Sequence, residues 1–194
     1  VGLDDITKGG LARGRLFLLE GSPGTGKTTI ATQFLMAGAA QGERSLYITL
    51  SETEDELRSG AASHGWSLER IDIFELVPPE SLLDEDQQQS LLYSSDLELG
   101  ETTKRIFEAF ERVKPERVVL DSLSEVRLVA QSSLRYRRQI LALKHYFARS
   151  KATVLMLDDL SSEANDRTMH SVAHGVIRLE ELSPEYGPER WRLR

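Results

Sequence analysis

The sequence predicts an α/β fold of three layers, in which helices cover both faces of a mainly parallel β-sheet. Two observations lead to this prediction. Short apolar runs alternate with stretches of helical length along most of the chain. A glycine-rich segment joins the first apolar run to the first helical stretch, as happens where a strand turns into a helix. The chain has 194 residues, 40% of them hydrophobic, which is enough for one substantial core, so residues 1–194 are expected to form a single domain.

Five strands are expected in the body of the sheet, and helices separate most of them. The expected strands are Leu16–Glu20, Ser45–Leu50, Ile71–Glu75, Arg117–Leu120 and Thr153–Leu157. The expected helices are Lys27–Ala40, Glu54–His64, Thr102–Val113 and Leu134–Ser150. Gly42 closes the first helix, and Pro115 stops the third just before a strand. Val172–Leu179 and Trp191–Arg194 are expected to be late strands of a hairpin or sheet extension.

The interval between residues 78 and 100 is the least regular part of the sequence. It holds paired prolines, a run of three acidic residues and three glutamines. We expect a long, exposed and mobile connection there, because nothing in it resembles a chemical motif. The chain starts at Val1 and ends in the alternating stretch Trp191–Arg194, so we expect a domain excised from a longer protein.

Composition narrows the partners and the compartment. The 24 basic and 31 acidic residues leave a net charge of −7, which gives no overall attraction for nucleic acid or an anionic membrane. The sequence has no cysteine, no apolar run near 18 residues and no secretory pattern at its start. A cytoplasmic location and no membrane partner are therefore expected.

The glycine-rich segment Gly21–Thr28 fits the phosphate-binding pattern G-x-x-x-x-G-K-[ST]. In such a loop, backbone N–H groups and the positive end of the following helix surround a phosphate chain. Lys27 is expected to reach the β- and γ-phosphates, and the Thr28 hydroxyl to coordinate Mg²⁺. The expected nucleotide-binding residues are Ser22, Pro23, Gly24, Thr25, Gly26, Lys27, Thr28 and Thr29. Thr29 is expected to contribute only as a residue of the first helical turn, and ATP or ADP with Mg²⁺ is the predicted ligand.

An acidic residue at the end of another strand completes the predicted metal site. The apolar run Arg117–Leu120 leads to Asp121, at the edge of the sheet where ligands bind in open α/β folds. We expect Asp121 to act as a Walker B carboxylate opposite Thr28, because Mg²⁺ usually keeps water ligands and uses few protein carboxylates. The alternative is that Asp121 caps the next helix.

Hydrolysis also requires a group that positions or deprotonates the attacking water. The strand Ser45–Leu50 delivers Glu52 to the same edge of the sheet, so Glu52 is the candidate base. A second interpretation remains open, because Ser51 and Glu54 fit a helix capping box that would make Glu52 a first-turn acid. Asp158 and Asp159 follow another strand, and one of them is a candidate for the phosphate site, with helix or turn capping as its alternative.

Taken together, these motifs resemble those of the KaiC-like branch of the RecA superfamily over almost the whole chain. The segments that carry the resemblance are Gly2–Asp5, Gly9–Leu11, Gly21–Thr28, Tyr47–Glu52, Val118–Ser124, Arg135–Gln139 and Gly175–Leu179. The resemblance implies a RecA-like P-loop ATPase core that forms homo-oligomeric rings, usually hexamers, with ATP between neighbouring subunits. It also implies a basic residue donated by the next subunit. Arg192 and Arg194 could take that part, although the solvent face of a strand is the simpler role for them.

The chain departs from the family pattern at one position of the site. Relatives carry two adjacent acids after the second strand, whereas this chain has Ser51 followed by Glu52. Neighbouring side chains of an extended segment point to opposite faces, so Glu52 does not simply replace the missing acid. Slow hydrolysis is therefore predicted, in a ring-forming regulatory or signalling ATPase with an unknown protein partner.

Three other functions remain open from the sequence. The family resemblance allows a serine/threonine autokinase, with Thr168 and Ser171 as candidate acceptors. A helix rich in basic residues, with interleaved aromatic residues such as Tyr136 and Phe147, allows nucleic-acid-dependent ATP hydrolysis, although a core-facing helix is the simpler interpretation. A passive ATP-binding assembly module is the third. His170 and His174 share an i,i+4 spacing but have no further ligand nearby, so zinc is not expected.

Overall fold

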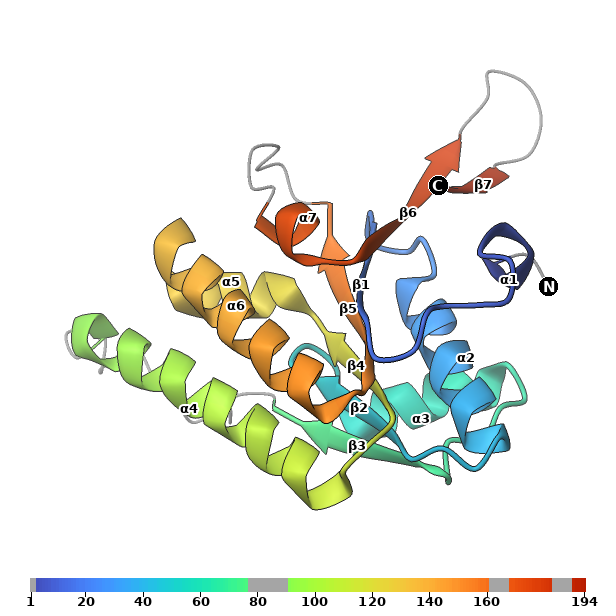
Figure 1. The fold of residues 1–194 in the computed structure, drawn as a ribbon, viewed down its shortest axis with the longest axis horizontal. Helices are drawn as coiled ribbons and strands as arrows, with labels where there is room; N and C mark the ends of the chain where they lie inside the picture. Colours follow the sequence, from blue (N-terminus) through green and yellow to red (C-terminus); the bar gives the residue numbers. More distant parts are fainter. Residues whose placement is uncertain (1–2, 77–90, 161–167, 183–189) are drawn as a thin grey trace.

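The computed structural model describes residues 3–76, 91–160, 168–182 and 190–194. Its strands are β1 Leu16–Gly21, β2 Ser45–Thr49, β3 Ile71–Glu75, β4 Arg117–Asp121, β5 Thr153–Asp159, β6 Gly175–Leu182 and β7 Arg190–Leu193. They form one seven-stranded sheet in the order β3-β2-β4-β5-β1-β6-β7 (Figure 1). Neighbouring strands are parallel throughout, except that β7 runs antiparallel to β6.

Helices cover both faces of this sheet (Figure 1). They are α1 Leu3–Ile6, α2 Lys27–Ala40, α3 Glu54–Ser63, α4 Leu91–Val113, α5 Leu123–Ala130, α6 Ser133–Ser150 and α7 Thr168–Val172. Apolar residues of α4, α5, α6 and α7 form one buried cluster with the sheet, and those of α2 and α3 form a second cluster on the opposite face. None of the helices in the described ranges is long and apolar enough to cross a bilayer. The predicted three-layer arrangement is confirmed.

The main differences from the sequence prediction lie in α4 and around α7. Helix α4 begins at Leu91, so the predicted loop is wrong for residues 91–100, and residues 77–90 lie outside the described ranges. The helix includes this segment because Leu99 is buried in the core. Leu99 lies seven residues, or about two turns, before the buried Ile106, so both face the core from the same side of the helix. Val172 ends the short helix α7 rather than opening a strand, and β6 starts at Gly175. The short helices α1 and α5 were not expected.

Parallel pairing brings the carboxyl ends of four central strands to one edge of the sheet. Gly21 of β1 is in register with Asp159 of β5, and Thr49 of β2 is in register with Asp121 of β4. In an open α/β sheet this edge is where ligands bind. The sheet therefore places the phosphate-loop motif and the acidic strand ends side by side.

At the opposite edge, Arg117 joins β4 to α2. Its guanidinium Nη1 donates to the Phe34 carbonyl at 2.8 Å, its Nε pairs with Glu43 at 2.5 Å, and it lies 5.0 Å above the Phe34 ring. The side chain crosses the helix at Gly38, where an added Cβ would lie only 2.6 Å from the Arg117 Cδ. Gly38 therefore allows the close approach of the arginine to the helix.

Candidate functional site

The phosphate-loop motif forms the turn between β1 and α2. Gly24 and Gly26 adopt positive φ angles of 81° and 88°, which glycine tolerates best. Thr25 folds the loop back on itself by donating its hydroxyl to the Ser22 carbonyl at 2.7 Å. At Gly21 an added Cβ would lie 2.6 Å from the Thr25 hydroxyl and 3.0 Å from the Leu179 carbonyl, so a larger residue does not fit. The open N-terminus of α2 then follows this loop, in an arrangement suited to an anion.

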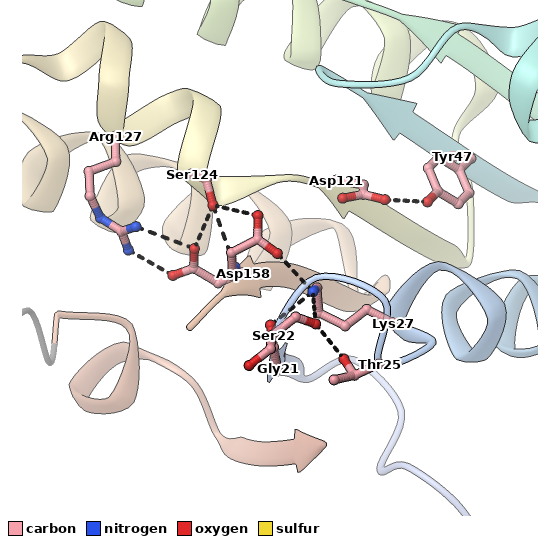
Figure 2. Close-up of polar contacts among 10 residues, drawn as sticks. Gly21, Ser22, Thr25, Lys27, Tyr47, Asp121, Ser124, Arg127 and Asp158 are labelled. Carbon is pink, nitrogen blue, oxygen red and sulfur yellow. Dashed lines mark hydrogen bonds and ion pairs between the residues drawn. The ribbon is translucent and has the colours of Figure 1, made fainter. Parts of the chain in front are cut away.

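Lys27 lies at the start of α2 with only 8% of its surface exposed. Its ammonium nitrogen lies 2.9 Å from the Gly21 carbonyl oxygen and 3.1 Å from that of Ser22. The third partner is a carboxylate oxygen of Asp159, 2.7 Å away. The ammonium group thus lies inside the loop, between the backbone and one acidic side chain (Figure 2).

Asp121 ends β4 and is 7% exposed. One of its carboxylate oxygens accepts a hydrogen bond of 2.6 Å from the Tyr47 hydroxyl (Figure 2). The Thr28 side chain lies close to the same carboxylate and favours its charged form. Burial raises the pKa of Asp121, although the bond from Tyr47 and the charge of Lys27 oppose that shift. The carboxylate therefore lies beside both the loop lysine and the loop threonine.

Tyr47 is a site residue that the sequence analysis missed. It is 1% exposed, and burial next to Asp121 raises the pKa of its hydroxyl well above the ordinary value, so the hydroxyl remains a proton donor. A signal did exist in the sequence. Tyr47 precedes Thr49 by two residues, and Thr49 is the register partner of Asp121, so Tyr47 points to the same face of the sheet. This signal can be interpreted only when β2 is known to pair with β4.

Glu52 follows β2 and is half-buried. Thr49 holds the backbone of Glu52 by two hydrogen bonds. Its hydroxyl donates to the Glu52 carbonyl and accepts from the Glu52 N–H. Burial, and then the charges of Asp121 and Glu56, raise the pKa of the Glu52 carboxyl. The carboxyl group thus lies near Asp121 at this edge of the sheet, whereas Ser51 is exposed.

The capping interpretation of this turn is wrong. Helix α3 is capped by Thr53, whose hydroxyl accepts from the Glu56 N–H while the Glu56 carboxylate accepts from the Thr53 N–H. The capping box is therefore shifted by two residues from the predicted Ser51–Glu54 pair. Glu52 lies before the N-cap and outside the first turn, so capping does not account for its place.

Asp158 and Asp159 diverge at the end of β5. Asp158 is buried and pairs with Arg127, with 2.7 Å between the closest nitrogen and oxygen. Burial raises the pKa of the Asp158 carboxyl, and the Arg127 guanidinium opposes the shift. The Ser124 hydroxyl lies between the two acids, 3.2 Å from an oxygen of Asp158 and 3.4 Å from one of Asp159. Of the two acids, Asp159 is the one that contacts the phosphate loop, through its ion pair with Lys27.

A hollow of about 260 Å³ adjoins the phosphate loop between α2 and α3. Its lining includes Thr28, Thr29, Glu52, His64 and Trp66. The His64 and Trp66 rings are stacked, with their centroids 4.9 Å apart. The hollow therefore adjoins the predicted phosphate site and has two aromatic rings in its lining.

The candidate phospho-acceptors and the histidine pair lie on and beside α7. Thr168 is 8% exposed, and the Ser171 hydroxyl donates to the Thr168 carbonyl at 2.8 Å. His170 pairs with the buried carboxylate of Glu20 at 2.8 Å, and His174 accepts a hydrogen bond of 3.1 Å from the Leu16 N–H. Each histidine therefore has a partner that fixes local structure.

The basic helix is α6, and its aromatic residues face inward. Tyr136 and Phe147 are 0% and 2% exposed and belong to the core cluster beneath the sheet. Lys144 donates to the Val172 carbonyl at 2.7 Å, so one of the basic side chains holds α7 in place. Tyr136 and Phe147 are therefore core residues and not surface platforms on which bases could stack.

Comparison with known proteins identifies relatives over nearly the whole chain. The family model described as "ATPase: KaiC" matches residues 1–193. The chain is 32% identical to the circadian clock oscillator protein KaiC of Thermostichus vulcanus over 164 residues, which are 84% of this chain and 31% of that protein. It is 28% identical to a UPF0273 protein of Aeropyrum pernix over 187 residues, covering 92% of this chain and 75% of the relative.

A solved structure agrees with the sequence matches. The crystal structure of a KaiC-like protein from Pyrococcus horikoshii OT3 is similar with a TM-score of 0.75 and 25% sequence identity, and the match covers 100% of this chain and 84% of that chain. The present chain spans less than a third of the length of the clock protein, 31%. The fold is RecA-like, and the family match indicates ATPase-type function. On this evidence, the chain belongs to the KaiC family of ATPases.

Proposed function

We propose that this domain binds ATP with Mg²⁺ at the Gly21–Thr28 loop and hydrolyses it slowly to ADP, as one subunit of a regulatory ring. The observation that carries the proposal is the meeting of Lys27, Asp121 and Glu52 at one edge of the sheet, from three different strand ends. Binding, metal coordination and activation of water each need one of these groups.

The phosphate chain is assigned to the loop from Ser22 to Thr29. Backbone N–H groups and the N-terminus of α2 would surround the phosphates, and the Lys27 ammonium would bind their oxygens. Thr28 and Asp121 fit a Mg²⁺ ion that is bound chiefly by phosphates and water, because they offer one hydroxyl and one buried carboxylate side by side. Such an ion offsets the charge that develops as the terminal phosphate leaves. The bond from Tyr47 fixes one carboxylate oxygen and leaves the other available.

Glu52 is assigned as the base that accepts a proton from the attacking water. Its raised pKa makes it a stronger base than an ordinary carboxylate, and it lines the hollow together with Thr28. The exposed Ser51 offers no second carboxylate beside it. Slow hydrolysis is the expected consequence.

Restoring the second acid should raise the hydrolysis rate. In the variant Ser51→Glu we expect turnover to increase about tenfold, because a second carboxylate beside Glu52 can share the positioning of water. Released phosphate under saturating Mg²⁺ and ATP measures the effect, and Ser59→Glu on the exposed side of α3 is the matched control. Equal turnover in the wild type and Ser51→Glu would show that Ser51 does not limit the rate.

The base and ribose are assigned to the hollow lined by His64 and Trp66, because Thr28 of the loop also lines it. An aromatic side chain in the lining can stack on a flat heterocycle. Nucleotide binding should therefore change the fluorescence of Trp66. The change should persist in Trp191→Phe and disappear in Trp66→Phe, since these are the chain's two tryptophans. A signal that survives in Trp66→Phe would place the base elsewhere.

Self-association into a ring, usually of six subunits, and an unknown signalling partner are carried over from the family resemblance. Arg192 on β7 and Arg194, the residue after β7, lie 3.9 and 3.4 Å from Glu180, with their side chains largely exposed. These positions support the simpler role, in which both arginines are solvent-facing residues of the sheet edge. A donated basic residue from a neighbouring subunit is therefore proposed without assigning it to either arginine.

The test is incubation with Mg²⁺ and ATP labelled at the γ-phosphate, in which released phosphate and label retained on the protein are followed together. Release without retention is the expected result. Retained label that is lost in Thr168→Ala or Ser171→Ala would replace this proposal with an autokinase, although Thr168 is buried. If the protein forms rings and binds ATP but neither releases phosphate nor retains label, it would be a passive assembly module.

A further inference from the structure

The ammonium group of Lys27 has as many oxygen partners as it has protons. It contacts the carbonyl oxygens of Gly21 and Ser22 and a carboxylate oxygen of Asp159, at 2.9, 3.1 and 2.7 Å. A phosphate oxygen that binds Lys27 must therefore take the place of one of these partners. The contact with Asp159 is the shortest of the three. Within the described ranges, Asp159 is the one acidic residue whose side chain pairs with this lysine.

Asp159 is also the partner that can turn away. Its side chain is 38% exposed, whereas the two carbonyl groups belong to the backbone of the loop itself. The backbone under Asp159 is nevertheless fixed to the loop, because Leu160 N–H donates to the Gly21 carbonyl at 3.2 Å. Ser124 holds the same position from the other side by accepting from the Asp159 N–H at 3.4 Å. The carboxylate can rotate, but its negative charge stays near the loop.

That charge lies toward one end of the expected phosphate chain. Backbone amides of the loop would surround the inner phosphates of a bound nucleotide, and Asp159 lies at the strand end in register with Gly21, at the start of the loop. A terminal phosphate bound by Lys27 would then lie near the Asp159 carboxylate, because both would contact the same ammonium group. Lys27 is expected to bind both phosphates. Repulsion by Asp159 therefore falls mainly on the terminal phosphate, which ATP has and ADP lacks.

We propose that Asp159 competes with the terminal phosphate for Lys27 and thereby lowers the preference of this site for ATP over ADP. The inference deepens the proposed function and rests on it. Asp158, the adjacent acid, does not share this role, because its carboxylate is directed to Arg127 (Figure 2). The sequence Asp158-Asp159 thus supplies one acid that pairs within the core and one that selects between nucleotides.

The test is isothermal titration calorimetry of the folded protein with Mg-ATP and, separately, Mg-ADP. In Asp159→Asn we expect ATP affinity to rise about tenfold and ADP affinity about twofold or less, because one unit charge near the terminal phosphate is removed. Asp159→Ser should behave like Asp159→Asn. Asp159→Glu keeps the charge and should keep the wild-type ratio of the two affinities. Added salt should reduce the difference between the wild type and Asp159→Asn.

Asp72→Asn is the matched control, because it removes one negative charge from an exposed position on β3. Its affinities should equal those of the wild type. Weaker ATP binding in Asp159→Asn, or equal gains for ATP and ADP, would overturn the role proposed for Asp159 and leave the proposed function standing. Absence of nucleotide binding in the wild type would overturn the proposed function itself, and the inference with it.

Discussion

Replacing Lys27 with alanine should lower the affinity for ATP by about two orders of magnitude, since charge-assisted hydrogen bonds to phosphate are the strongest contacts available in the loop. Lys27 is the one basic residue of the segment Gly21–Thr28, so no other cation of the loop can take its place. Calorimetric titration with Mg-ATP measures the loss. Hydrolysis should fall below detection at ATP concentrations that saturate the wild type.

Lys104→Ala is the matched control for this change, because Lys104 is an exposed lysine on α4 whose partner Glu108 lies 3.8 Å away. Its affinity for ATP should be unchanged. A thermal unfolding curve for each variant separates loss of binding from loss of fold. An ATP affinity in Lys27→Ala within threefold of the wild type would show that the nucleotide does not bind at this loop.

Replacing Glu52 with glutamine should lower turnover by about 100-fold or more while ATP affinity changes little. Glutamine keeps the shape of the side chain and removes the group that accepts a proton. Single-turnover hydrolysis together with calorimetric titration separates the two effects. Glu69→Gln, at an exposed position, is the control and should hydrolyse ATP at the wild-type rate.

The same variant gives a pH test with a defined sign. The active form of a base is the deprotonated form, and the pKa of Glu52 is raised by burial and by its acidic neighbours. Turnover of the wild type should therefore increase with pH through a limb that lies above the ordinary carboxyl range, and then level off. The limb should be missing from Glu52→Gln. A wild-type profile without this limb, or its persistence in the variant, would assign the base to another group.

The residues that the sequence identified at the site are those whose position follows from a strand end. Lys27 and Asp121 could be found this way, because a parallel sheet brings its carboxyl ends to one edge whatever the order of its strands. Tyr47 was missed, and the choice between Asp158 and Asp159 stayed open. Tyr47 matters because β2 lies beside β4, and Asp159 contacts Lys27 because β5 lies beside β1. Strand order is a property of the whole fold, which local patterns do not report.

The start of α4 and the cap of α3 differ from the prediction, and particular residues explain both. Gly100 lies inside α4 with open space where a Cβ would be, so it costs helix propensity without breaking the helix. Thr53 and Ser51 both suit a helix N-cap by type, and the choice of Thr53 is visible only in its reciprocal bonds with Glu56. Composition identifies which residues can cap or interrupt a helix, whereas packing decides which of them do.

The arginine that crosses α2 at Gly38 has a consequence for how the domain can respond to its nucleotide. Arg117 ties the strand that ends at Asp121 to the helix that begins at Lys27, by contacts at the far end of both elements. Lys27 and Asp121 are therefore carried by two elements that Arg117 holds together. A response to the change from ATP to ADP is expected outside these two elements, in the side chains of Glu52, which follows β2, and of Asp159, the last residue of β5. These two carboxylates are where the chemical state of the nucleotide can be converted into motion.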